Sequence, residues 1–178
     1  MRFQTFAPNE KIPENVIFPN QTHSTRVQEI ITGSENLTET DGVFTRKKNM
    51  ILGVKTADCA PIVFWDAEKL GVMHAGWRGL AQGIVEKMAG HFEKPHIWIG
   101  ALLPIFEIQR DFCFHELHAK FGDDFFEESG DTLRFRFLEA ICSVLPTAEW
   151  CGESTENAKW ASHRRGDATR NYTIVGEF

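Results

Sequence analysis

Two histidines and a cysteine lie where three expected strands end, and together they could bind one metal ion. His23 lies in the polar stretch 20–24, Cys59 in 56–61, and His74 opens 74–79. Two imidazoles and a thiolate supply three ligands of a tetrahedral zinc and leave a fourth position open, as catalytic zinc sites require. Loops carried by rigid strands are common places for such groups. The pattern indicates a catalytic metal site in which Cys59 and His74 also carry the chemistry.

Each of these residues also has an ordinary structural interpretation. A cysteine at a strand end is commonly a small buried apolar group, and a single histidine is commonly a hydrogen-bonded loop residue. The spacing of His23, Cys59 and His74 does not form a compact zinc-finger type of motif. Asp58, beside the thiol, could orient a ligand histidine or act as a general base, or it could cap its own loop.

Two arginines are candidates for binding an anionic part of the substrate. Arg78 directly precedes a helical pattern, so its guanidinium and the first N–H groups of the helix could bind phosphate or carboxylate. The alternative is a tight turn with Arg78 paired to a carboxylate. Arg165 lies in the basic segment 162–170, which could form a second anion clamp or a solvated charge cluster. His115 and His118 share a helical face but have no evident third ligand.

The elements that must position these residues are mainly strands, followed by helices. Short β-branched and aromatic runs predict strands over 27–31, 42–45, 50–55, 61–65, 70–74, 96–100 and 172–175. Apolar spacing predicts helices over 80–92, 111–120 and 134–145, with Asp111 as an N-cap and Phe112 among the inward-facing residues. Because strands outnumber helices and alternate with them only late, the pattern favours an α+β layered domain.

Length and composition limit the classes of protein to which the chain can belong. With 178 residues and 42% hydrophobic residues, we expect one domain, 1–178, with its own core. The net charge of −6 argues against nucleic acid as a partner. The N-terminus has no apolar signal segment, no run is long enough to span a bilayer, and the four cysteines are widely spaced. We therefore expect a cytoplasmic protein with no membrane partner; the oligomeric state is not indicated.

Several motifs, taken in order, resemble the YfiH-like "laccase domain" family. They are Gln21-Thr22-His23-Ser24, Asp41-Gly42-Val43, Thr56 to Pro61, His74-Ala75-Gly76-Trp77-Arg78-Gly79 and Ser162-His163-Arg164-Arg165. The resemblance covers about residues 20 to 170 and implies a four-layer α/β/β/α sandwich with mixed sheets. It also implies a zinc held by His23, Cys59 and His74, with Arg78 as a site residue and Arg165 as an anion contact.

The activities that the resemblance implies concern purine nucleosides and cell-wall peptides. Family members are associated with phosphorolysis of adenosine, inosine and methylthioadenosine, with adenosine deamination, and with editing of muropeptides. Two departures bear on substrate choice. The region before Gln21 is shorter than in the family, and the segment 100–106 lacks the two cysteines of the corresponding family motif.

The number and spacing of the histidines, as possible metal ligands, discriminate between the candidate functions. A four-copper laccase needs paired His-x-His motifs, whereas this chain has seven histidines and no such pair. One His/His/Cys site suits zinc, although copper can occupy it in vitro. The leading hypothesis is a zinc-dependent purine nucleoside enzyme acting on nucleoside and phosphate. The alternatives are an amide hydrolase editing muropeptides, a metal-free hydrolase using Cys59 and His74, and a non-catalytic binding protein.

Overall fold

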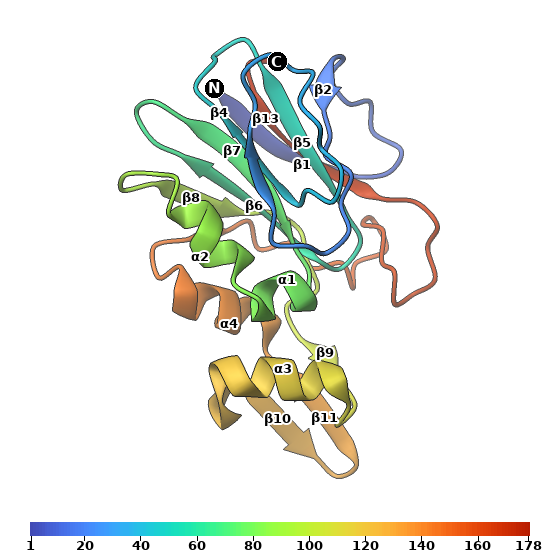
Figure 1. Cartoon of the computed structure of the whole chain (residues 1–178). Coiled ribbons are helices and arrows are strands. Elements are labelled where there is room, and N and C mark those ends of the chain that lie inside the picture. The colour runs from blue at the N-terminus through green and yellow to red at the C-terminus, as the bar shows by residue number, and fades with distance from the viewer.

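Two mixed β-sheets stacked face to face form the centre of the computed structural model, which describes residues 1–178 (Figure 1). The larger sheet has the order β12-β8-β6-β7-β4-β3, and the smaller has the order β1-β13-β5-β2. The bounds in the larger sheet are β3 Val27–Glu29, β4 Gly42–Thr45, β6 Ala60–Trp65, β7 Leu70–Ala75, β8 His96–Ile99 and β12 Glu149–Trp150. Those in the smaller sheet are β1 Arg2–Phe6, β2 Val16–Ile17, β5 Ile51–Thr56 and β13 Asn171–Gly176.

The central strands β6 and β7 are buried on both faces, which explains their nearly continuous apolar sequences. Successive side chains point to opposite faces of the sheet. Ile62 and Phe64 therefore face the helices, and Val63 faces the smaller sheet, where it joins a cluster with Leu52 and Val175. This packing fixes the ends of β6 and β7, from which two of the candidate site residues come.

The helices lie on the side of the larger sheet (Figure 1). The helix predicted over 80–92 is in fact two short helices, α1 Trp77–Ala81 and α2 Ile84–Ala89, so the prediction of one continuous helix is wrong. Gly83, with φ 89°, lies between them in the left-handed region that glycine adopts readily and that interrupts a helix. The predicted apolar stripe still packs inward, because Leu80, Ile84 and Met88 belong to the main core.

A third helix and a small sheet form the far end of the molecule. α3 Phe112–Phe121 packs with the sheet β10-β11-β9. As predicted, the Asp111 side chain caps this helix by accepting from the amides of Cys113 and Phe114. The inward placement of Phe112 is wrong, because its side chain is 62% exposed. The other elements here are β9 Phe106–Glu107, the 3-10 helix η1 Asp123–Phe125, β10 Phe126–Ser129, β11 Thr132–Phe135 and α4 Phe137–Val144.

Two further differences come from strand pairing. The helix predicted over 134–145 begins at Phe137, because residues 132–135 form the hairpin strand β11 beside β10. The N-terminal strand β1 was not predicted, and it pairs along its whole length with β13. The α+β class with stacked mixed sheets is confirmed, with the helices gathered on one side of the two sheets. None of the helices combines the length and apolar character needed to cross a membrane.

Candidate metal centre and active site

His23, Cys59 and His74 converge at one end of the larger sheet, although they come from separate elements. Their candidate ligand atoms all lie within 4.8 Å of one another, and the Cys59 Sγ is 3.8 Å from the His23 Nε2. Strand pairing explains part of this convergence, because Pro61 lies opposite His74 in the β6–β7 ladder and Cys59 directly precedes β6. The rings of His23 and His74 are 4.7 Å apart, edge to face. This is the one group of three metal-binding side chains in the described residues, which are the whole chain.

Asp41 holds both histidines in place and is the important site residue that the sequence interpretation missed. Asp41 is fully buried and directly precedes β4. The Oδ1 atom accepts from the His74 Nδ1 at 2.8 Å and from the His23 amide at 3.0 Å. The Oδ2 atom accepts from the amides of Thr22 and Ser24 at 3.1 and 2.7 Å. Because Nδ1 of His74 donates to Asp41, its Nε2 is left to face a metal.

Two residues of the site have strained backbones. His23 and Asp58 have φ values of 62° and 78°, which residues other than glycine seldom adopt. Such conformations cost about 1–3 kcal/mol each and persist where the surroundings fix them. The hydrogen bonds that Asp41 accepts from the amides of residues 22–24 fix the backbone around His23. Part of the folding free energy therefore offsets the strain that orients this imidazole.

The charges of Cys59 and His74 stabilise one another. Burial disfavours the thiolate, but the charge of His74 and the hydrogen bond with His23 outweigh burial and lower the pKa of Cys59 to about 6. Burial also disfavours the imidazolium, but the Cys59 thiolate and the hydrogen bond to Asp41 raise the pKa of His74 to about 9. Without metal, the site therefore holds a thiolate–imidazolium pair near neutral pH. A metal ion would replace the proton as the positive partner of the thiolate.

We expect iodoacetamide to alkylate Cys59 selectively when the metal has been removed with a chelator. Because the thiolate is the nucleophile, the rate should rise as the pH passes through about 6, the pKa of Cys59, and level off above it. Cys113 is the internal control, since burial and Asp111 raise its pKa to about 12. Mass spectrometry of peptides labelled at pH 7 measures both. Equal labelling of the two cysteines would contradict the thiolate–imidazolium pair.

The three residues open onto a cavity of about 780 Å³. Trp77, Phe106 and Phe137 form an apolar part of its lining. Cationic and imidazole side chains form another part, contributed by Lys55, His163, Arg164 and Arg170. Asp58 is the one carboxylate among the lining residues. The cavity therefore combines three candidate metal ligands, aromatic surface and positive charge in a chain whose net charge is −6.

The two arginines predicted to bind an anion are not among the residues that line this cavity. Arg78 is exposed, with its guanidinium 5.3 Å from the centroid of the Trp77 ring. Arg165 donates to the carbonyl oxygens of Thr155 and Trp160 and to the Asp167 carboxylate. The predicted basic cluster does reach the cavity, but through other members, Arg164 and Arg170.

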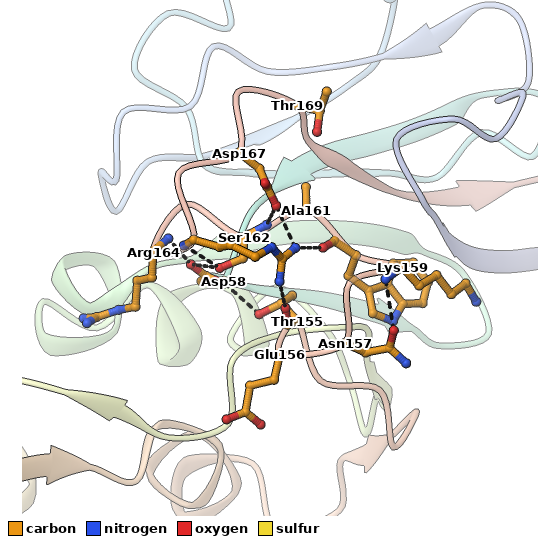
Figure 2. A network of polar contacts seen from close by, with 12 residues as sticks. Asp58, Thr155, Glu156, Asn157, Lys159, Ala161, Ser162, Arg164, Asp167 and Thr169 are labelled. Atoms are coloured by element: carbon orange, nitrogen blue, oxygen red, sulfur yellow. Dashed lines mark hydrogen bonds and ion pairs between the residues drawn. The ribbon is translucent and has the colours of Figure 1, made fainter.

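Asp58 is placed beside the site but does not contact a histidine ligand. Its carboxylate accepts from the hydroxyls of Thr155 and Ser162, at 2.7 and 3.1 Å, and from the Arg164 amide at 2.9 Å (Figure 2). The orienting role that was one interpretation of Asp58 is therefore filled by Asp41. Asp58 instead joins loop 57–59, which carries Cys59, to the C-terminal loop, residues 151–170.

Gly76 lies against two of the candidate metal ligands, His23 and Cys59. A Cβ atom at this position would lie 2.5 Å from the His23 Cδ2 and 3.1 Å from the Cys59 Sγ. The backbone conformation, φ −87° and ψ 172°, suits any residue, so the requirement for glycine here is one of space. The sequence showed this glycine only as part of a turn, because its contacts come from segments that are distant along the chain.

Substituting Gly76→Ala should weaken metal binding at least about tenfold with little loss of stability, because the exposed His23 ring must move away from the new methyl group. Gly90→Ala is the matched control, since its Cβ would meet the nearest atom at 3.4 Å. Competition with a chromophoric chelator measures the affinity, and thermal unfolding measures the stability. Unchanged metal affinity in Gly76→Ala would show that the packing of these side chains does not matter for binding.

Comparison with known proteins gives one matching family and several relatives that are similar over part of the chain. A family model described as "Multi-copper polyphenol oxidoreductase laccase" matches residues 2–138. A "Purine nucleoside phosphorylase" of Aquifex aeolicus is 42% identical over 87 residues, which are 49% of this chain and 40% of that protein. "Adenosine deaminase RL5" of an unknown prokaryotic organism is 39% identical over 90 residues, covering 42% of this chain and 34% of that protein.

Solved structures share the fold over most of the chain. Bacillus licheniformis hypothetical protein YfiH superimposes with a TM-score of 0.78 at 22% identity, covering 92% of this chain and 74% of that one. YlmD from Geobacillus stearothermophilus gives a TM-score of 0.76 at 23% identity, with the same two coverages. In contrast, the chain spans only about two fifths of the length of the curated relatives whose sequences it matches.

Proposed function

Since this chain belongs to the family described as multi-copper polyphenol oxidoreductase laccases, we propose that it is a metal-dependent enzyme of purine nucleosides. The membership agrees with the resemblance to the YfiH-like laccase domain. Relatives named purine nucleoside phosphorylase and adenosine deaminase support the substrate class. The observation that carries the proposal is the convergence of His23, Cys59 and His74 on the wall of a cavity of about 780 Å³.

The residues at this site fit one metal ion, and we propose zinc. Two imidazoles and a thiolate already lie near one another, and the Cys59 thiol has a lowered pKa that suits a metal ligand. When bound, zinc would supply Lewis acidity at its remaining open position. The family description names several coppers, whereas the chain offers one group of three such side chains, so a four-copper site has too few ligands.

The chain's own residues would bind and orient a nucleoside in this cavity. Trp77, Phe106 and Phe137 offer aromatic surface for a purine base, and ligand sites of a few hundred Å³ commonly combine such surface with a few polar groups. Asp41 keeps the proton of His74 on Nδ1. Asp58 is less suited to act as a general base, because its oxygens already accept three hydrogen bonds.

Product analysis of the metal-loaded protein tests this proposal. We expect inosine and adenosine to be cleaved to the free base and a ribose phosphate. This cleavage should occur only when phosphate is present. Mass spectrometry of the products separates phosphorolysis from hydrolysis and from deamination, which leaves the glycosidic bond intact. No change in any purine nucleoside, by a protein shown to contain its metal, would overturn the proposed substrate class.

A metal-free hydrolase using Cys59 and His74 is the second candidate, and the thiolate–imidazolium pair favours it. It would lose activity on alkylation of Cys59 and keep it on removal of metal, whereas the zinc enzyme would lose activity on both. The muropeptide amide hydrolase and the non-catalytic binding protein have no specific support in the cavity. We retain the cytoplasm as the proposed location, consistent with four free cysteines.

A further inference from the structure

Arg164 is a cavity-lining arginine whose charged group has an aromatic neighbour but no hydrogen-bond or ion-pair partner in the protein. Its guanidinium makes no hydrogen bond or ion pair, and its Cζ lies 4.7 Å from the centroid of the Phe106 ring, another lining residue. Arg170 differs, because its guanidinium donates to the carbonyl oxygens of its own loop, of which the nearest belongs to Thr169. Lys55 lines the cavity as an exposed ammonium 5.1 Å from the Phe18 ring. Of the two lining arginines, only Arg164 has all of its guanidinium donors free, because Nη1 of Arg170 is bonded to its own loop.

The main chain of Arg164 is hydrogen-bonded to loop 57–59, which carries Cys59, through the Asp58 side chain. The Arg164 amide donates to the Asp58 Oδ2, and the Ser162 hydroxyl donates to the same oxygen. The Thr155 hydroxyl donates to the other oxygen of Asp58. These contacts join residues about a hundred positions apart in the sequence. In Figure 2, the Arg164 side chain extends away from this network while its backbone stays bonded to it.

Hydrogen bonds that do not involve Arg164 stabilise the rest of the C-terminal loop. Arg165 binds the carbonyl oxygens of Thr155 and Trp160, so it joins two turns of the loop. The Asn171 side chain forms two hydrogen bonds with the backbone of Ala161, at 2.8 and 3.0 Å. The two adjacent arginines therefore have different roles. Arg165 stabilises the loop, and the loop holds the Arg164 side chain at the cavity.

We infer that Arg164 binds a phosphoryl group in the cavity, and that Asp58 is a positioning residue that acts through Arg164. A guanidinium offers paired donors that match phosphate oxygens, and stacking on Phe106 limits its orientations. Asp58, the one lining carboxylate, has its oxygens occupied by donors and so repels an anion less. The inference rests on the proposed function for the substrate class, but binding of the anion is measurable by itself.

Equilibrium binding to the metal-loaded protein tests the role of Arg164, with inorganic phosphate and adenosine 5′-monophosphate as separate probes. Arg164→Gln should weaken the binding of at least one probe about ten- to a hundredfold, and Arg164→Lys should restore it only in part. Arg46→Gln is the matched control, because Arg46 is an exposed arginine paired with Glu29 and Glu68. An effect on inorganic phosphate identifies a free phosphate site, and an effect on the nucleotide alone identifies a phosphoester site.

A double-mutant cycle tests the role of Asp58. Asp58→Asn should weaken binding of the same probe in the wild type but add little in the Arg164→Gln background, because it acts through that side chain. Ser162→Ala removes one of the same hydrogen bonds and serves if Asp58→Asn does not fold. Metal content should stay unchanged in all variants. Binding of both probes unaffected by Arg164→Gln, or full additivity of the two substitutions, would overturn the inference, whereas absent turnover with intact phosphate binding would overturn only the proposed function.

Discussion

Replacing Cys59 by alanine should reduce the metal content from one ion per chain to nearly none. The substitution removes the one thiolate of the group and leaves two imidazoles, of which His23 is exposed. Binding free energies of structural zinc are about 10–16 kcal/mol for the whole ligand set, so the loss of one anionic ligand should weaken binding at least about a hundredfold. Elemental analysis after purification without added metal measures the effect.

The control for this substitution is Cys142→Ala, which removes a half-buried thiol on α4 that is not part of the metal-binding group. It should keep full metal content. Circular dichroism should show both variants folded, since Cys59 lies at a partly exposed loop and the neighbouring strand β6 is held by two ladders. Full metal content in Cys59→Ala would remove this cysteine from the site.

Asp41→Asn should weaken metal binding by about ten- to a hundredfold, because residues that orient metal ligands typically contribute that much. The asparagine keeps one acceptor oxygen, but its NH₂ group would face amides or the His74 ring nitrogen that now donate to a carboxylate. The His23 loop would lose part of its anchor, and His74 would lose the partner that fixes its proton. Chelator competition measures the change.

Asp66→Asn is a closely matched control for this prediction. Asp66 also accepts from three backbone amides, those of Glu68, Lys69 and Glu93, but it does not line the candidate site. Its substitution should lower stability without changing metal affinity. If the two variants lose metal affinity equally, the effect of Asp41 would come from general destabilisation and not from orienting the histidines.

Strands and the three converging side chains could be predicted from sequence because local patterns and ordered motifs carry that information. Short β-branched and aromatic runs predicted β4, β6 and β7, and Asp111 predicted the start of α3. Breaks in otherwise regular patterns were harder to predict. At Gly83 the apolar stripe continues across two helices, so the sequence pattern does not show that the helix is interrupted there. The pairing of β1 with β13 depends on contacts between the two ends of the chain, which no local pattern reports.

The choice between neighbouring residues in a loop could not be predicted. Arg164 and Arg165 are chemically identical, and an irregular loop has no period that tells which one faces the cavity. The hydrogen bonds of Asp58 and of the Arg165 guanidinium determine which of the two arginines faces the cavity, and these bonds form only in the folded loop. Asp41 was visible as part of a motif, but its bonds to the His23 loop and His74 require the assembled sheet.

X-ray absorption at the zinc edge tests the proposed metal centre most directly. The protein purified without added metal should show a first shell with one sulfur at about 2.3 Å and nitrogen ligands at about 2.0 Å. The sulfur contribution should disappear in Cys59→Ala loaded with excess zinc. A first shell of oxygen and nitrogen alone in the wild-type protein, or the absence of any stoichiometric metal, would contradict a centre formed by His23, Cys59 and His74.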